Sequence, residues 1–391
     1  MTGPLENIRV LDLGRYQAGP RCGLMFARMG AEVIKIESLL GDESRKNSPY
    51  VRGQSIYWVQ YNSGKKSLAM DLRTEEGKTI LRDLVKVSDC FLQNFRPGTI
   101  EKIGFSYDEL KKINRRIIMI NVSAYGADTN LKHRVGFDPI GQAVGGMMMT
   151  SGEPDGPPIR TNFPLIDRIT ALHATIGALA ALHERDKSGI GQSINVSLAD
   201  SGFTTNEIPI SAYLSGGLDF EREGNGAGLT NAYQCTDGWV FLAATNRSMF
   251  ERLSKALNIP EWIDDARYKT RQLRKDNSSL LEESLTKWFI SKTQSHAVEY
   301  LSKYSVPCAK INDTKSAAEE DYIIDSEIME KVPDPIAGNV WVTGKSIKFS
   351  RTPMKVQGAP TIGEHTNLIL NDILNYSPEK IQRLKDSQII R

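Results

Sequence analysis

Short runs of aliphatic and β-branched residues alternate with helix-forming stretches through the first half of the chain, and this rhythm limits the fold more than any other feature. RVLDLG (9–14) and EVIKIE (32–37) have the composition of buried strands, and CGLMFARMG between them has the pattern of a helix ending at Gly30. The rhythm repeats in SLAMDL (67–72), TEEGKTILRDLVKV, CFLQNF (90–95), RIIMINVSAYG (116–126) and SINVSL (193–198). Because parallel strands need crossover helices, the alternation predicts a Rossmann-like, doubly wound α/β domain.

The pattern changes after EREGNGAGLTNA (221–232), where AYQCTDGWVFLAAT predicts a hairpin with Asp237 and Gly238 as its turn. Before that point, a long helix is expected from Asp167 to about residue 185, with a face of small residues that allows close packing. The predicted organisation is a large domain over 1–200, a linker over 201–225, a smaller α+β domain over 226–320, and a segment over 321–391 that returns to the large domain.

Charge and composition favour a small anionic ligand over a macromolecular partner. The chain has 49 basic and 47 acidic residues, for a net charge of +2, and the two signs are interspersed, which gives no reason to expect nucleic acid. The cysteines have no metal-binding spacing and predict reduced thiols in a cytoplasmic protein: Cys22, Cys90, Cys235 and Cys308. The start has no secretory pattern, and the run ALHATIGALAAL is too short to span a bilayer, so no membrane is expected.

Two connections that follow predicted strands are candidate site walls, because open α/β sheets bind ligands at the carboxyl ends of their strands. LGRYQAGPRCG does not have the glycine spacing of a dinucleotide site, so a tight turn is the alternative. NFRPG (94–98) brings Arg96, with Lys102 nearby, to a strand end in an arrangement suited to phosphate. A solvated loop is the alternative there.

Two aspartates precede helical stretches and have two open interpretations each. Asp138 in GFDPIGQAVGG and Asp167 before ITALHATIGALAAL are both placed to cap a helix, which is the commoner role. The alternative for Asp138 is that it helps to position a reacting group. The alternative for Asp167 is that of a nucleophile, because an ionised aspartate at a helix start can attack an activated carbonyl. GNGAG (224–228) is either a flexible linker or a mobile lid whose backbone amides face a substrate.

Together these segments resemble the family III coenzyme A (CoA) transferases, also called the CaiB/BaiF family, over nearly the whole chain. The similar stretches are VLDLGRYQAGP, GAEVIKIE with GDESR, NSGKKSLAMDL, NFRPGTIEKIGF, GFDPIGQAVGGMMMTSGEPDGPP, DRITALHATIGALAALHERDKSGIGQSINVSL and GEHTNLIL. The resemblance implies CoA as co-substrate, acyl-CoA and small carboxylic acids as partners, an interlocked homodimer, and neither a metal nor a redox cofactor.

The resemblance also assigns residues. It implies that Asp167 is the nucleophile, with Gln17 and Asp138 as further catalytic residues. The CoA groove of the formyl-CoA transferases in this family corresponds to Gln17, Ala18, Met70, Asn94, Phe95 and Lys102, and Arg96 matches a basic CoA contact. An arginine that often meets the CoA nucleotide is Ser38 here, so Arg45 or Lys66 is expected to replace it. Arg134 lies beside Val135, where some relatives carry a lysine, and the lid would contain Gly224, Gly226 and Gly228.

The implied reaction is a ping-pong transfer of CoA through an acyl-aspartyl anhydride and an aspartyl-CoA thioester on Asp167. One alternative is an α-methylacyl-CoA racemase of the same fold, but Phe137 occupies the position of the proton-transfer histidine of that enzyme. A non-catalytic CoA-binding subunit is the other alternative, and retention of the nucleophile argues against it.

Overall fold

The computed structural model describes residues 3–226 and 228–391, which form two compact units. The first unit comprises the described residues of Met1–Met147, Arg160–Leu218 and Ile324–Arg391. The second comprises those of Met148–Ile159 and Asp219–Ile323.

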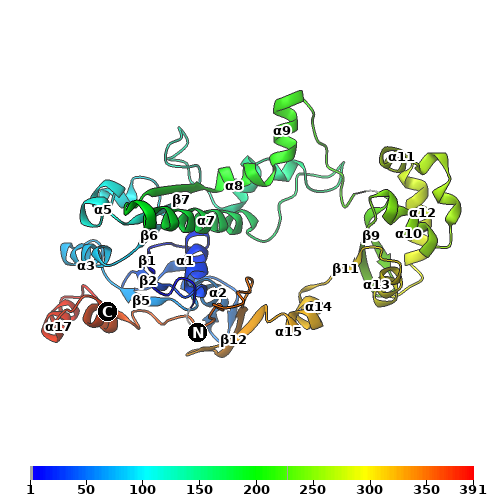
Figure 1. Ribbon diagram of the computed structural model, residues 1–391. Helices are drawn as coiled ribbons and strands as arrows, with labels where there is room; N and C mark the ends of the chain where they lie inside the picture. Colours follow the sequence, from blue (N-terminus) through cyan, green and yellow to red (C-terminus); the bar gives the residue numbers. More distant parts are fainter. Residues whose placement is uncertain (1–2, 227) are drawn as a thin grey trace. The chain divides into compact units, whose positions relative to one another are not determined.

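A six-stranded, fully parallel sheet forms the centre of the first unit, with the strand order β5-β2-β1-β6-β7-β8 (Figure 1). Its strands are β1 (Arg9–Asp12), β2 (Glu32–Glu37), β5 (Lys66–Ala69), β6 (Cys90–Gln93), β7 (Ile118–Ser123) and β8 (Ser193–Ser197). The predicted α/β fold is therefore confirmed. The chain moves outward from β1 in one direction through β2 and β5, and in the other through β6, so the strand order reverses between β1 and β6.

Helices cover both faces of this sheet because alternate strand residues point to opposite sides. In β1, Val10 joins the core beneath α1 and α7, whereas Leu11 joins the core beneath α3, α5 and α17. These helices are α1 (Ala18–Arg28), α3 (Glu75–Lys86), α5 (Tyr107–Ile113), α7 (Leu165–Ser188) and α17 (Pro378–Asp386). The other elements of this unit are β3 (Tyr50–Val51), β4 (Gln54–Ser55), α2 (Ile56–Asn62), α4 (Thr99–Lys102), α6 (Asp138–Val144), α8 (Leu198–Thr205), α9 (Glu207–Gly216), β12 (Met329–Asp334), β13 (Gly338–Thr343) and α16 (Thr366–Leu368).

Helix α7 is long and apolar enough to cross a membrane by length and composition alone. Its predicted small-residue face instead packs against the sheet, where Ala174 and Ala178 are fully buried in the core shared with α1. A Cβ on Gly177 would lie 3.2 Å from a side-chain carbon of Ile194 on β8, so α7 packs closely on this strand at the glycine. These contacts identify α7 as a core helix.

The C-terminal residues extend the edge of the parallel sheet. Ile390 forms an antiparallel bridge with Met70, and the backbone N–H of Arg391 donates to the carbonyl of Ala69 at 3.2 Å. Ile381 and Leu384 of α17 are buried in the core with them. The last segment of the chain is thus part of the first unit.

The second unit has a three-stranded antiparallel sheet in the order β11-β10-β9. Its elements are β9 (Thr230–Cys235), β10 (Gly238–Ala243), α10 (Arg247–Ala256), α11 (Arg271–Asp276), α12 (Ser278–Phe289), α13 (Gln294–Lys303), β11 (Cys308–Lys310) and α14 (Thr314–Glu319), and α15 (Asp321–Asp325) lies at its boundary. The hairpin forms as predicted, but its turn is one residue earlier. Because Cys235 pairs with Gly238, the turn residues are Thr236 and Asp237.

Candidate active site

The loops that follow β1 and β6 meet at the carboxyl edge of the sheet, where the strand order reverses and an open α/β sheet forms a crevice. Asn94 ties them together. Its side-chain oxygen accepts a hydrogen bond from the backbone N–H of Arg15 at 2.6 Å, and its side-chain nitrogen donates to the carbonyl of Arg15 at 2.8 Å. A Cβ on Gly19 would lie 3.1 Å from the Cα of Gly14, so the start of α1 approaches the β1 loop closely only because both residues are glycines.

Buried charged side chains form hydrogen bonds with the backbone of the loop that follows β1. Asp12 accepts a hydrogen bond from the N–H of Gly14 at 2.8 Å and forms an ion pair with Lys65 at 2.6 Å. Lys35 donates to the carbonyl of Gly14 and pairs with Asp42 at 2.8 Å. Burial alone would raise the pKa of Asp42, but Lys35 overcomes it and lowers that pKa to about 2. Both polar groups of Gly14 are therefore held by charged side chains, which makes the loop rigid.

Asp167 is the third residue of α7, and the prediction that it caps this helix is wrong. The cap position is Pro164, whose side chain has no acceptor. The backbone N–H of Asp167, one of the free donors at the helix start, instead donates to Asp138 Oδ2 at 3.0 Å. Asp138 is the first residue of α6 but caps α7, and Gln142 donates to its other oxygen at 2.5 Å. Among the residues that the structure describes, none forms a hydrogen bond or ion pair with the carboxyl group of Asp167 itself.

The carboxyl group of Asp167 has an unusual acidity. Burial, and then the negative charge of Asp138, raise the pKa of Asp167 from 3.8 to about 7. The raised pKa means that the ionised carboxylate is poorly solvated. Reaction with an electrophile removes its charge, so it stabilises this carboxylate more than it would a well-solvated one. A strongly perturbed pKa in a cleft is typical of catalytic groups.

Asp167 lines a cavity of about 460 Å³ with six of the other predicted site residues. They are Gln17, Ala18, Asn94, Phe95, Arg96 and Arg134. We call this space the Asp167 cavity. The side-chain nitrogen of Gln17 lies 3.5 Å from the carbonyl of Pro164, which places the start of α1 against the start of α7. Arg96 and Arg134 are exposed at the cavity, and neither forms an ion pair within residues 3–226 and 228–391.

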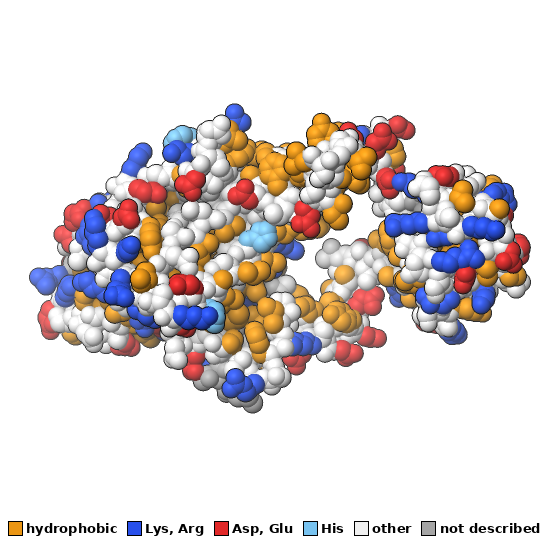
Figure 2. Space-filling view, turned by 45° about the horizontal axis from the view of Figure 1, so that its top comes forward, with side chains coloured by type: hydrophobic (Ala, Val, Ile, Leu, Met, Phe, Trp, Pro, Cys, Tyr) orange, Lys and Arg blue, Asp and Glu red, His pale blue; other side chains and the backbone are white. Residues whose placement is uncertain are grey.

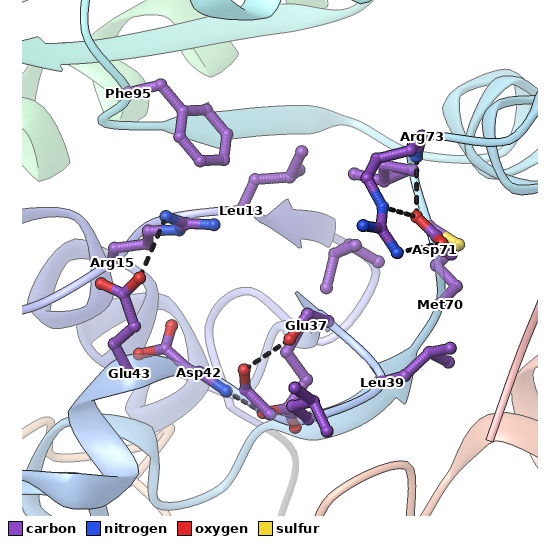
Figure 3. Close-up of a pocket in the computed structure, with 15 residues that line it drawn as sticks. Leu13, Arg15, Glu37, Leu39, Asp42, Glu43, Met70, Asp71, Arg73 and Phe95 are labelled. Carbon is purple, nitrogen blue, oxygen red and sulfur yellow. Dashed lines mark hydrogen bonds and ion pairs between the residues drawn. The ribbon is translucent and has the colours of Figure 1, made fainter.

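A second cavity of about 380 Å³, which we call the Met70 cavity, adjoins the first and shares Arg15, Glu43 and Phe95 with it. Figure 3 shows Arg15 and Glu43 on one side of this cavity and Arg73 and Asp71 on the other. The Arg73 guanidinium forms a bidentate pair with Asp71 at 2.9 and 2.7 Å, and Arg15 lies 3.7 Å from Glu43. Two arginines, Arg15 and Arg73, therefore line a cavity that shares three lining residues with the Asp167 cavity.

Three predicted CoA contacts lie outside both cavities. Arg45 donates twice to the buried Glu37, at 2.9 and 2.7 Å, and its guanidinium lies 3.6 Å from the centre of the Trp58 ring. Lys66 pairs with Glu32 at 2.5 Å near the amino ends of the strands, opposite the crevice. Lys102 is exposed at the end of α4. Arg45 and Lys66 thus have structural partners in the first unit.

The glycines of the predicted lid belong to the second unit. Gly224, Gly226 and Gly228 all have positive φ angles, which explains the choice of glycine, and Ala227 between them lies outside the described residues. The N–H of Gly224 donates to the carbonyl of Gly152, and that of Gly228 donates to Glu282 at 2.6 Å. Their role as a lid stays a prediction.

Sequence reasoning missed three residues of the two cavities. Arg15 and Arg73 both follow strands. The argument that identified Arg96, that ligands bind at the carboxyl ends of the strands, therefore applies to them as well. Tyr16 has a left-handed backbone, with φ of 59°, an uncommon conformation for a residue with a side chain. Its hydroxyl donates to Glu43 at 2.7 Å, and its ring packs edge-on against Phe137. No local pattern in the sequence signals this conformation.

Known proteins resemble this chain over its full length. The model of CoA-transferase family III matches residues 5–366. The succinyl-CoA–D-citramalate CoA-transferase of Chloroflexus aurantiacus is 34% identical, covering 99% of this chain and 98% of that one. The formyl-CoA:oxalate CoA-transferase of Streptomyces avermitilis is 30% identical with full coverage of both.

The fold agrees with these matches. The crystal structure of a CaiB/BaiF family protein from Brucella suis superposes with a TM-score of 0.85 at 30% identity, covering 95% of this chain and 100% of that one. The family match, the identities and the parallel sheet all agree with the resemblance found in the motifs. The chain belongs to CoA-transferase family III.

Proposed function

We propose that this enzyme moves CoA from an acyl-CoA to a free carboxylic acid through covalent intermediates on Asp167. The observation that carries the proposal is the position of Asp167: its backbone is held by Asp138, while its carboxyl group faces a cavity and has a raised pKa. Ionised aspartate is an established nucleophile toward activated carbonyls. The relatives named above, which are CoA-transferases by name, support the same reaction class.

The proposed reaction has four steps. The Asp167 carboxylate attacks the thioester carbonyl, forming an acyl-aspartyl anhydride and releasing the CoA thiolate. The thiolate attacks the aspartyl carbonyl, which releases the donor acid and leaves an aspartyl-CoA thioester. The acceptor carboxylate attacks this thioester, forming a new mixed anhydride and releasing the thiolate again. The thiolate then attacks the acceptor carbonyl, giving the new acyl-CoA and free Asp167.

Each step develops negative charge on a carbonyl oxygen, which requires a hydrogen-bond donor. The side-chain amide of Gln17 is the best-placed candidate, because it is buried at the start of α1 and faces the carbonyl of Pro164 at only 3.5 Å. This weak hydrogen bond leaves the amide able to turn toward an oxyanion. Asp138 acts through Asp167, as a positioning residue that holds the start of α7.

CoA would extend across both cavities. We assign its thioester end to the Asp167 cavity and its phosphates to Arg15 and Arg73 of the Met70 cavity. These two arginines would replace the CoA-binding arginine that relatives often carry at the position of Ser38. Arg96 and Arg134 remain candidates for further anionic groups at the Asp167 cavity. Arginine suits phosphate because its planar donors bind two oxygens at once.

Racemase activity is not favoured. Phe137 lines the Asp167 cavity and is 60% exposed, and its ring has no group that carries a proton. A 2-methylacyl-CoA incubated in deuterium oxide without an acid acceptor should therefore show no C2 exchange at catalytic rates.

A homodimer is part of the proposal. Figure 2 shows patches of hydrophobic side chains at the surface, and α9, which has no buried residue, exposes Ile208, Tyr213 and Leu214 by 69, 60 and 79%. Large apolar side chains exposed on a helix that buries none of its own residues support such a subunit interface. The four cysteines are free, which supports a reducing cytoplasmic location.

The proposal is tested by incubating the purified enzyme with a panel of acyl-CoAs and free acids and reading the products by mass spectrometry. If the enzyme transfers CoA, a new acyl-CoA should appear only in samples that contain both a donor acyl-CoA and an acceptor acid. Hydrolysis of the donor without a new thioester would contradict it.

A further inference from the structure

A carboxylate lies on the wall that the Asp167 cavity and the Met70 cavity have in common. The residues that line both cavities are Arg15, Glu43 and Phe95. The phosphates of CoA are negatively charged, and a carboxylate beside them repels them. Arg15 attracts such a ligand, whereas Glu43 opposes it, so the presence of Glu43 on this wall requires an explanation.

The side chain of Arg15 extends between the other two residues of the shared wall. Its guanidinium carbon lies 5.2 Å from the centre of the Phe95 ring, and its Nη1 lies 3.7 Å from Oε1 of Glu43 (Figure 3). The backbone of Arg15 is fixed, because the side chain of Asn94 binds both its N–H and its carbonyl. Rotation of the side chain alone can therefore give Arg15 a different partner.

Glu43 is held at this wall by its neighbours. Asp42 forms a buried ion pair with Lys35 at 2.8 Å, and the hydroxyl of the fully buried Ser44 donates to Asp42 at 2.6 Å. The second carboxylate oxygen of Glu43 accepts a hydrogen bond from the Tyr16 hydroxyl at 2.7 Å. The backbone and the carboxylate of Glu43 thus both have fixed contacts.

The pair of Arg15 and Glu43 is weak enough to exchange partners. The side chains of Arg15 and Glu43 are 47% and 61% exposed, and an exposed ion pair contributes little. A phosphate accepts two parallel hydrogen bonds from a guanidinium group, and these charge-assisted bonds are stronger. A phosphate in the Met70 cavity would therefore displace Glu43 from Arg15.

We propose that Glu43 is a positioning residue that competes with the phosphates of CoA for Arg15. The inference rests on the proposed function, because that function assigns the phosphates to Arg15. When CoA binds, the guanidinium group turns from Glu43 to the phosphates, and when CoA leaves, it returns to Glu43. The carboxylate thereby weakens CoA binding and promotes release of the acyl-CoA product.

The variant Glu43→Gln tests this competition, because it removes the charge and keeps an oxygen for the Tyr16 hydroxyl. Calorimetric titration of the full-length enzyme with free CoA measures the dissociation constant. We expect Glu43→Gln to bind CoA about fivefold more tightly than the wild type, chiefly through slower dissociation. The matched control is Glu109→Gln, which removes an exposed carboxylate that pairs with Lys112 outside both cavities and should leave the constant unchanged.

Two further variants separate competition from other roles of Glu43. Arg15→Gln should bind CoA more weakly, and the addition of Glu43→Gln to it should improve binding by less than about twofold, because the contested cation is gone. Tyr16→Phe removes the hydrogen bond to Glu43 but leaves the carboxylate in place, so it should not tighten CoA binding.

The outcomes separate this inference from the proposed function. If Glu43→Gln binds CoA no more tightly than the wild type, Glu43 does not compete for Arg15, although CoA transfer stands. The competition is also overturned if Arg15→Gln binds CoA normally, if the gain from Glu43→Gln is equal with and without Arg15, or if Tyr16→Phe produces the same gain. If the wild type neither binds nor transfers CoA, the proposed function fails, and this inference fails with it.

Discussion

Replacing Asp167 by asparagine should stabilise the protein in a pH-dependent way. Folding moves this carboxyl group into a site where its pKa is about 7 instead of 3.8, a difference of about 3 pH units. Each unit corresponds to about 1.36 kcal/mol, so ionised Asp167 lowers the free energy of unfolding by at most about 4 kcal/mol. Solvent that reaches the half-buried carboxylate reduces this figure, and we expect about 2 to 4 kcal/mol.

The sign of the effect follows from the raised pKa. Below about pH 3, well under the unperturbed pKa of 3.8, Asp167 is protonated in both the folded and the unfolded chain, so Asp167→Asn should have little effect there. As the pH rises, the unfolded chain releases the proton first, and the wild type loses stability until about pH 7. The stability gained by the variant should therefore grow with pH and stay constant above pH 7.

Urea unfolding of both proteins at half-unit intervals from pH 5 to 8.5 measures this difference. Asp186→Asn is the matched control, because Asp186 lies exposed on the same helix, 3.7 Å from Arg116, and such a surface pair contributes little. A difference between wild type and Asp167→Asn that is the same at every pH would refute the raised pKa.

Three further predictions follow from the same geometry. Asp138→Asn should move the lower pH limit of kcat/KM downward, because a charge that raises the pKa of Asp167 is removed. It should also cost about 1 kcal/mol of stability, because an amide has one oxygen and can accept only one of the two hydrogen bonds that the carboxylate accepts from Asp167 and Gln142; a pH profile and urea unfolding measure the two effects. Arg73→Ala should raise the KM for acyl-CoA about tenfold in steady-state kinetics, and a larger rise in Lys102→Ala would instead place the phosphates near that lysine. Lys65→Met should lower the free energy of unfolding by about 3 to 5 kcal/mol, because it leaves a buried carboxylate unpaired; an unchanged urea midpoint would contradict the burial of this ion pair.

The sheet was predictable from the sequence because its signal is local. Strands buried on both faces need continuous apolar runs, and EVIKIE coincides with β2 residue for residue. The loops after β1 and β6 were also predictable as a site, since their positions in a parallel sheet follow from the strand order. Asn94 then ties these loops together through contacts with Arg15 across 79 residues.

Long-range polar partners were not predictable. Asp138 was expected to cap its own helix, yet it caps α7, which starts 27 residues later. Arg45 was expected at the CoA nucleotide, yet Glu37 and Trp58 hold it inside the first unit. A sequence shows that a charge is present, whereas its partner depends on which segments the fold brings together.

Covalent labelling of Asp167 tests the central claim most directly. The enzyme is mixed with an acyl-CoA donor and no acceptor acid, treated with borohydride, and digested for peptide mass spectrometry. The aspartyl-CoA thioester should be reduced to an alcohol on one peptide, the one that contains Asp167, and the Asp167→Ala variant should lose both the label and nearly all turnover. A label on Asp138, or normal transfer by Asp167→Ala, would contradict the account.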